Sequence, residues 1–167
     1  VSKLRAFHRA GQTFILFAQP DPPITDKSIN SEQFAAVLKT LREQPTKTTF
    51  RIYRHDKPIT AETIGRARRI GEVESLAIYQ QSYMRIKSHG EYYGPHEDAE
   101  SVLPTWFVGE NEPVLPGQSF FVWTPTETGK AWYAVTTVQD GTENLAAVGE
   151  GNVAAVEEKV AEPAPVL

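Results

Sequence analysis

Cysteine is absent from the 167 residues, which excludes disulfide bonds, thiol nucleophiles and cysteine-ligated zinc. No apolar run approaches the ~20 residues that a membrane-spanning helix needs, so we expect no membrane insertion. The net charge of −4 gives no electrostatic basis for binding nucleic acid or an anionic membrane surface. The chain also lacks a zinc-protease motif, a phosphate-binding glycine loop and an EF-hand loop. We therefore expect no cofactor and no catalytic residue.

The residues that are present are typical of a soluble globular protein. Hydrophobic residues make up 40% and charged residues 23% of the chain, the usual balance for a folded domain. Twelve prolines and eleven glycines favour a strand-rich fold with many turns over a helical one. The length suffices for one domain with a real core.

Much of the chain consists of short apolar or alternating runs with the length of β-strands, separated by turn residues. The runs are 4–8, 13–17, 49–54, 70–79, 105–108, 119–123, 131–138 and 145–148. The first two runs flank Gly11 and the last two flank Asp140-Gly141, so each pair predicts a β-hairpin. Strands at such turn-separated intervals predict an antiparallel β-sandwich.

One segment has the period of an α-helix instead. Its apolar residues at i, i+3, i+4 and i+7 are Phe34, Val37, Leu38 and Leu41, which form one helical face. Asn30 with Gln33 resembles a capping box, and Pro45 ends the helix. We expect this single amphipathic helix to lie against the sandwich or over one of its edges.

Two of these segments carry a resemblance to fibronectin type III domains. The run 50–54, Phe-Arg-Ile-Tyr-Arg, resembles their third strand, and 132–138 with the turn 140–144 resembles their last hairpin. The opening residues 4–14 are similar to the first strand pair of divergent members in large exported bacterial proteins. The resemblance implies a mainly β, fibronectin type III-like (immunoglobulin-like) antiparallel sandwich with an inserted helix and a long loop. It also implies a secreted, cell-surface or periplasmic location and an adjoining hydrolase domain.

The composition changes near the end of the chain. Residues 156–167 are rich in Pro, Ala and Glu, which is typical of a semi-rigid interdomain linker. We therefore predict a sandwich domain over 1–155, a linker over 156–167, and an adjoining domain or chain of the parent protein as the partner.

Candidate functional residues gather in a turn-rich loop, Ser82–Pro104. The set His89, Glu91, His96 and Asp98 offers imidazole and carboxylate ligands for a transition metal or calcium; the alternative is a solvated polar loop. Tyr83, Tyr92 and Tyr93 could stack on sugar rings or peptide chains. The aromatic residues of the apolar strands, Trp106, Trp123, Trp132 and Tyr133, are expected to pack in the core instead.

These patterns predict a non-catalytic accessory module, and the resemblance implies that it supports or orients a hydrolase domain. The alternative is a carbohydrate- or polymer-binding module that uses the 82–104 loop, with a polysaccharide as its partner. A third hypothesis is a hydrolase fragment that contributes the histidine-rich loop to a neighbouring active site.

Overall fold

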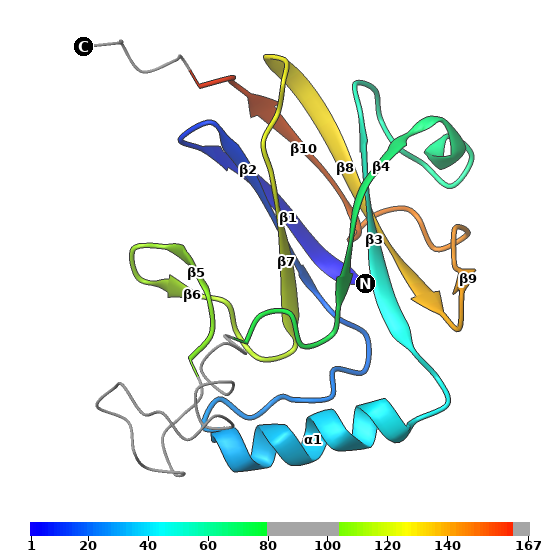
Figure 1. The fold of residues 1–167 in the computed structure, drawn as a ribbon. Helices are drawn as coiled ribbons and strands as arrows, with labels where there is room; N and C mark the ends of the chain where they lie inside the picture. Colours follow the sequence, from blue (N-terminus) through cyan, green and yellow to red (C-terminus); the bar gives the residue numbers. More distant parts are fainter. Residues whose placement is uncertain (80–103, 162–167) are drawn as a thin grey trace.

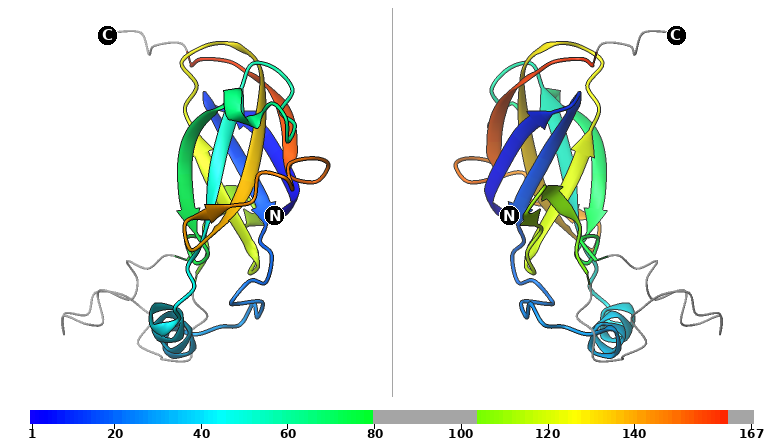
Figure 2. Two further views of the ribbon diagram at one scale, coloured as in Figure 1. Left: turned by 90° about the vertical axis from the view of Figure 1, so that its right-hand side faces the viewer. Right: turned by 90° about the vertical axis from the view of Figure 1, so that its left-hand side faces the viewer.

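The computed structural model describes residues 1–79 and 104–161 of the chain. These residues form two main antiparallel β-sheets that pack face to face, a small two-stranded sheet beside them, and one α-helix below them (Figure 1 and Figure 2). The predicted mainly β, sandwich-like architecture with an inserted helix is confirmed.

The first sheet has the strand order β1-β2-β7, with β1 at Ser2–Arg9, β2 at Gln12–Ala18 and β7 at Gln118–Trp123. The β1–β2 hairpin turns through Ala10 and Gly11, both at positive φ (51° and 76°). Two central residues at positive φ define the turn whose twist matches that of the flanking strands. The first predicted hairpin is therefore confirmed.

The second sheet has the order β10-β8-β3-β4. Its strands are β3 (Thr48–His55), β4 (Arg68–Glu74), β8 (Gly129–Gln139) and β10 (Val153–Glu158). The two-residue strand β9 (Thr142–Glu143) pairs with the end of β8. A short 3₁₀ helix, η1 (Ile64–Arg66), lies in the connection between β3 and β4.

The main core fills the space between the two sheets. Its fully buried members are Ile15, Phe17, Phe50, Ile52, Ala131, Tyr133 and Val135. Phe17 and Phe50 meet across the sheets edge to face, with ring centroids 5.3 Å apart. Gly71 of β4 faces the ring of Phe121 so closely that a Cβ would overlap it. A glycine is thus required where β4 crosses this ring.

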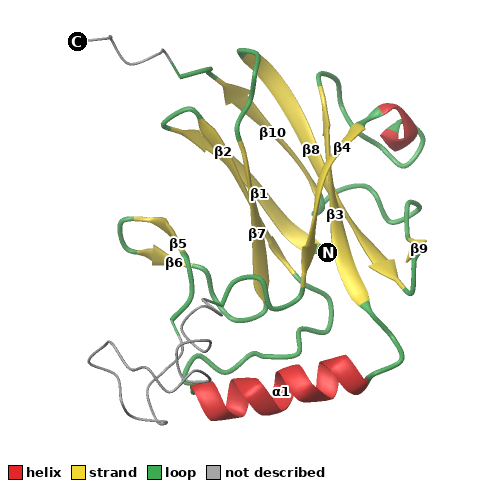
Figure 3. Cartoon of the chain, in the orientation of Figure 1, coloured by secondary structure: helices red, strands yellow, loops and turns green. Residues whose placement is uncertain are grey.

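A second core lies between the base of the sandwich and the helix α1 (Ser31–Glu43), which crosses below the sheets (Figure 3). Phe34 is fully buried there and contacts Tyr79. The predicted capping box is present, because Asn30 accepts from the Gln33 N–H and Gln33 accepts from the Asn30 N–H.

The hairpin of β5 (Phe107–Gly109) and β6 (Glu112–Pro113) packs onto the outer face of the β1-β2-β7 sheet. Val108 and Val114 are buried in the same cluster as Leu16 of β2. The β5–β6 hairpin therefore covers part of the outer face of this sheet.

Several predictions about local structure are wrong. The run 70–79 is a strand only as far as Glu74, where β4 ends and a turn begins. The run 145–148 forms no strand, because the chain leaves β9 after two residues and the long partner of β8 is β10. Residues 156–158 belong to β10 and not to a linker, since they pair with residues 129–131 of β8. Trp106 is 45% exposed, because it lies in the small covering hairpin and not between the sheets.

Candidate functional site

The residues that the sequence suggests for metal or ligand binding lie outside the described part of the chain. They are Tyr83, Tyr92 and Tyr93 for ligand stacking, and His89, Glu91, His96 and Asp98 for a metal. These assignments remain predictions. Within residues 1–79 and 104–161, no three histidine, aspartate or glutamate side chains come close enough to hold a metal ion together. In the same ranges, no helix has the length and apolar character to cross a membrane.

The most deeply buried charge in the described residues is Glu158, the last residue of β10, which is only 2% exposed. Its Oε1 accepts hydrogen bonds from Thr13 Oγ1 at 2.6 Å and from the Tyr133 hydroxyl. Its Oε2 accepts from Arg54 Nε at 3.0 Å and Nη2 at 2.6 Å. The carboxylate thus joins β10 to strands β2, β8 and β3, across both sheets.

Electrostatics keep the Tyr133 and Arg54 side chains of this network each in one charge state. Burial raises the pKa of Tyr133 above its ordinary range, and the neighbouring carboxylate raises it further. Burial alone would lower the pKa of Arg54, but the hydrogen bonds to Glu158 outweigh burial and raise it. Tyrosine therefore stays neutral and arginine stays charged throughout the neutral pH range.

The chain leaves the sandwich directly after this network. The His8 ring lies beside Thr13, with Nδ1 3.0 Å from Oγ1, and its Nε2 contacts the Lys159 carbonyl oxygen at 2.8 Å and the Lys159 nitrogen at 3.2 Å. One residue further on, the Val160 N–H donates to Thr128 Oγ1 at 3.1 Å. The exit from β10 is consequently held by a side chain of β1 and by one that directly precedes β8.

A second carboxylate is bound on the outer face of the β10-β8-β3-β4 sheet. Glu143 Oε1 accepts from Thr136 Oγ1 at 2.5 Å and from Tyr53 Oη at 2.7 Å, and Oε2 pairs with Arg51 Nη1 at 2.7 Å. Burial tends to raise the pKa of Glu143, but these donors outweigh burial and lower it. Burial and the neighbouring carboxylate raise the pKa of Tyr53 to about 12. Arg51 also binds Glu72, with Nε 3.0 Å from Oε2.

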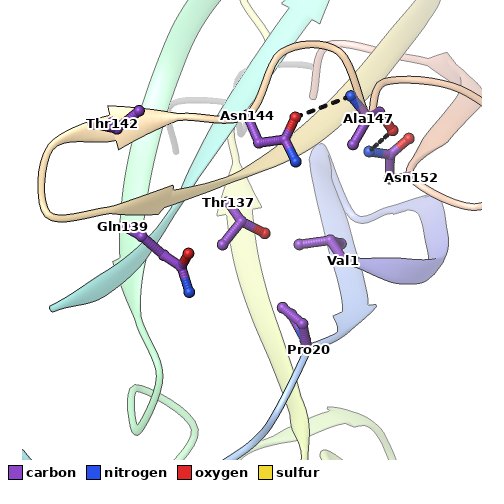
Figure 4. Close-up of a pocket in the computed structure, with 8 residues that line it drawn as sticks. All are labelled: Val1, Pro20, Thr137, Gln139, Thr142, Asn144, Ala147 and Asn152. Atoms are coloured by element: carbon purple, nitrogen blue, oxygen red, sulfur yellow. Dashed lines mark hydrogen bonds between the residues drawn. The ribbon is translucent and has the colours of Figure 1, made fainter. Parts of the chain in front are cut away.

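A small pocket of about 250 Å³ opens where β10 no longer covers β8 (Figure 4). It is lined by Val1, Pro20, Thr137, Gln139, Thr142, Asn144, Ala147 and Asn152. Apart from the amino group of Val1, every polar group in this lining is an uncharged amide or hydroxyl.

Two asparagines shape the loop over this pocket. Asn152 is 4% exposed and is fully bonded, accepting from the Gly149 N–H and donating to the carbonyls of Val135 and Ala147. Asn144 uses only its Oδ1, which accepts from the Ala147 N–H at 3.3 Å. Within the described chain, its Nδ2 has no partner, so it can donate to a bound molecule.

Exposed apolar side chains gather on the β5–β6 hairpin. Trp106, Phe107 and Leu115 are 45%, 59% and 40% exposed. Aromatic side chains are enriched in contacts between proteins, so this hairpin offers a surface on which another domain could pack.

The sequence alone predicts neither the Glu158 network nor the small pocket. Glu158 meets partners 145, 104 and 25 positions away along the chain, and no local pattern marks such contacts. Thr142 and Asn144 were recognised only as turn residues after Asp140-Gly141. Comparison of the chain with protein-family models, curated proteins and solved structures finds no match.

Proposed function

We propose that this chain is a non-catalytic accessory module, a sandwich of the fibronectin type III kind, which orients a neighbouring domain of a larger exported bacterial protein. Its seven longest strands, divided three and four between two antiparallel sheets, support a sandwich of this kind. Export and a neighbouring hydrolase are supported by the sequence resemblance.

The observation that carries the proposal is the anchoring of the chain's exit. Glu158 is fixed from three other strands, and the next two residues are held by His8 and Thr128. A polypeptide that leaves a sheet through such contacts leaves it in one direction. Whatever follows starts from a defined point and orientation, which is what an orienting module requires.

The state of the two best-bound carboxylates supports a structural role for them. Each oxygen of Glu158 and of Glu143 already accepts at least one hydrogen bond or ion pair from within the sandwich. A general base needs an oxygen within reach of a substrate proton. These carboxylates are instead engaged in joining strands.

The proposal predicts that the gene encodes a further folded domain after Leu167, and a gene that encodes none would refute it. Small-angle X-ray scattering on that longer polypeptide measures the spread of distances between the domains. We expect Glu158→Gln to broaden this distribution at a temperature where both domains stay folded. Glu157→Gln is the matched control, since Glu157 is an exposed neighbour on the same strand. Equal distributions for the two variants would contradict the orienting role.

A second candidate function is the binding of a neutral polymer, and the small pocket is the observation that favours it. Its free hydroxyl and amide groups suit hydroxyl or amide groups of a ligand. A larger pocket of about 620 Å³ lies next to it beside α1, and Pro20 and Gln139 line both pockets. Two adjoining pockets suit an extended molecule better than a compact one.

Chitotriose is a suitable probe, because it is neutral and bears both hydroxyl and acetamide groups. We expect NMR signals of Thr142 and Asn144 to shift on titration with a Kd of about 1 mM, since no aromatic ring lines the pocket for stacking. Asn144→Ala should weaken binding and Asn111→Ala, on the distant β5–β6 turn, should not. If the Tyr92→Ala/Tyr93→Ala double variant lost binding and Asn144→Ala did not, the binding site would lie in the 82–104 loop instead.

A further inference from the structure

The β5–β6 hairpin and the residues that flank it present three large apolar side chains to solvent, Trp106, Phe107 and Leu115. In the described part of the chain only five such side chains are exposed, so most of them gather here. Val108 and Val114 of the same segment are buried against the outer face of the β1-β2-β7 sheet. This buried pair fixes the hairpin on the sandwich, and the three exposed residues, here named the hairpin surface, are not needed to hold it there.

Arg9 of β1 lies at the edge of the hairpin surface. Its guanidinium stacks over Phe14, with Cζ 5.1 Å from the ring centroid, and its Nη1 lies 3.8 Å from the point that a Cβ on Gly109 would occupy. Arg5 on the same strand is paired with Glu112, whereas exposed Arg9 has no carboxylate partner among the described residues. The ring supports one face of the guanidinium and leaves its N–H groups free to bind a carboxylate through two hydrogen bonds.

Glu110, in the turn of the hairpin, adds a charge of the opposite sign. It is exposed, and no cation in the described chain pairs with it. The hairpin surface thus has an apolar centre and one free charge of each sign beside it. Protein interfaces have this composition, with aromatic and apolar residues at the centre and a polar rim. The matching partner surface is apolar, with a carboxylate facing Arg9 and a cation facing Glu110.

The chain leaves the sandwich on the same side. After β10 it crosses the β1–β2 turn, where a Cβ on Gly11 would lie only 2.6 Å from the Cβ of Ala161. Gly11 is two residues from Arg9, or about 7 Å along a strand, and Arg9 in turn reaches Gly109 of the hairpin. Figure 1 shows the β1–β2 turn, the end of β10 and the β5–β6 hairpin on one side of the molecule. A polypeptide that continues from Ala161 therefore emerges beside the hairpin surface.

We propose that the hairpin surface is where the following domain packs, an inference that rests on the orienting function proposed above. A connection that emerges beside the docking surface needs only a short span, so the neighbour meets this surface at a high effective concentration. The anchored exit fixes where the neighbouring domain starts, and the hairpin surface keeps that domain from turning about the connection. The domain is then held at two points.

Hydroxyl-radical footprinting read by mass spectrometry tests this contact on the longer polypeptide. The oxidation rate of a side chain follows its exposure, and the 167-residue chain gives the reference rates. We expect Trp106 and Phe107 to be oxidised severalfold more slowly in the longer polypeptide. Leu145, which is 40% exposed and lies outside the hairpin, should keep its rate. Equal rates at Phe107 in both polypeptides would overturn the proposal, and so would slower oxidation in the 167-residue chain as its concentration rises, which would assign the surface to a second copy.

Substitutions then assign the contact to these side chains. Leu115→Ser and Leu145→Ser are a matched pair, since both leucines are 40% exposed and only Leu115 belongs to the hairpin surface. We expect Phe107→Ser/Leu115→Ser to broaden the interdomain distances measured by small-angle X-ray scattering, and Leu145→Ser to leave them unchanged. Arg9→Glu should broaden them as well, because it sets a like charge against the partner's carboxylate. Each variant should keep a Tm close to that of the wild type, since the replaced side chains are exposed.

The outcomes separate the docking surface from the function on which it rests. If Glu158→Gln broadens the interdomain distances and Phe107→Ser/Leu115→Ser does not, the docking surface is wrong and the anchored exit still orients the domain. If neither variant broadens them, both proposals fail.

Discussion

Replacing Glu158 by glutamine tests how much the buried carboxylate contributes to folding. The substitution preserves size, so it opens no cavity, but it leaves the Arg54 guanidinium without its charge partner. It also points an amide N–H₂ toward hydroxyls that need an acceptor. Removing one partner of a buried ion pair costs about 3–5 kcal/mol. The Arg54 side chain is 22% exposed and Glu158 is fully buried, so water relieves part of the loss and we expect about 3 kcal/mol.

Urea unfolding followed by tryptophan fluorescence at pH 7 measures this loss. With an m-value of about 2 kcal/mol/M for a chain of this size, the midpoint should fall by about 1.5 M and m should not change. The same loss should lower Tm by about 6–12 °C. Glu157→Gln should change the free energy of unfolding by less than about 0.5 kcal/mol.

One further variant separates the hydrogen bonds from the ion pair. Tyr133→Phe removes a single donor to Glu158 and should cost about 1 kcal/mol. A Glu158→Gln protein as stable as the Glu157→Gln control would refute the reasoning, because it would mean that the four hydrogen bonds to the carboxylate contribute nothing net.

Three other outcomes are expected. Gly71→Ala should lower the free energy of unfolding by about 1–3 kcal/mol, because the new Cβ overlaps the Phe121 ring. Gly65 has open space around it, so Gly65→Ala should leave the free energy of unfolding nearly unchanged. Equal effects of the two substitutions would contradict the packing argument. Asn30→Ala should cost about 1 kcal/mol through loss of the capping box, measured by thermal unfolding, and an unchanged Tm would count against it. The folded-state pKa of Glu143 lies below its ordinary value of 4.5, so the stability that Glu143 contributes is present above that value and is lost as pH falls through the folded-state pKa. Glu143→Gln should therefore reduce the loss of stability at acid pH, measured by urea unfolding at a series of pH values. An unchanged loss at acid pH would exclude Glu143 as its cause.

The sequence predicts those parts of the fold that depend on neighbours along the chain. The β1–β2 hairpin follows from Gly11 between two apolar runs, and α1 follows from its apolar period with Asn30 and Gln33 at its start. Strand β3 follows from the alternation of Phe50 and Ile52. In each case the signal and the structure span fewer than about twenty residues.

What the sequence does not predict depends on contacts between distant segments. Asp140-Gly141 predicts the turn correctly, but nothing local shows that β9 ends after two residues and that β10 becomes the long partner of β8. Glu158 follows Glu157 in a segment with the composition of a linker. Only the donors from three other strands, brought together by folding, distinguish it from its exposed neighbour.

The relation of β1 to β10 has a mechanical consequence. Leu4 contacts Gly151 near the start of β10, through a backbone hydrogen bond of 2.8 Å, and His8 contacts Lys159 just past its end, so the two strands run in the same direction. The chain thus enters at one end of the sandwich and leaves at the other (Figure 1). A pull on its two ends loads these contacts in shear along the strands, so they must break together and cannot be peeled apart one at a time. The first and last strands would therefore carry tension from one end of the module to the other.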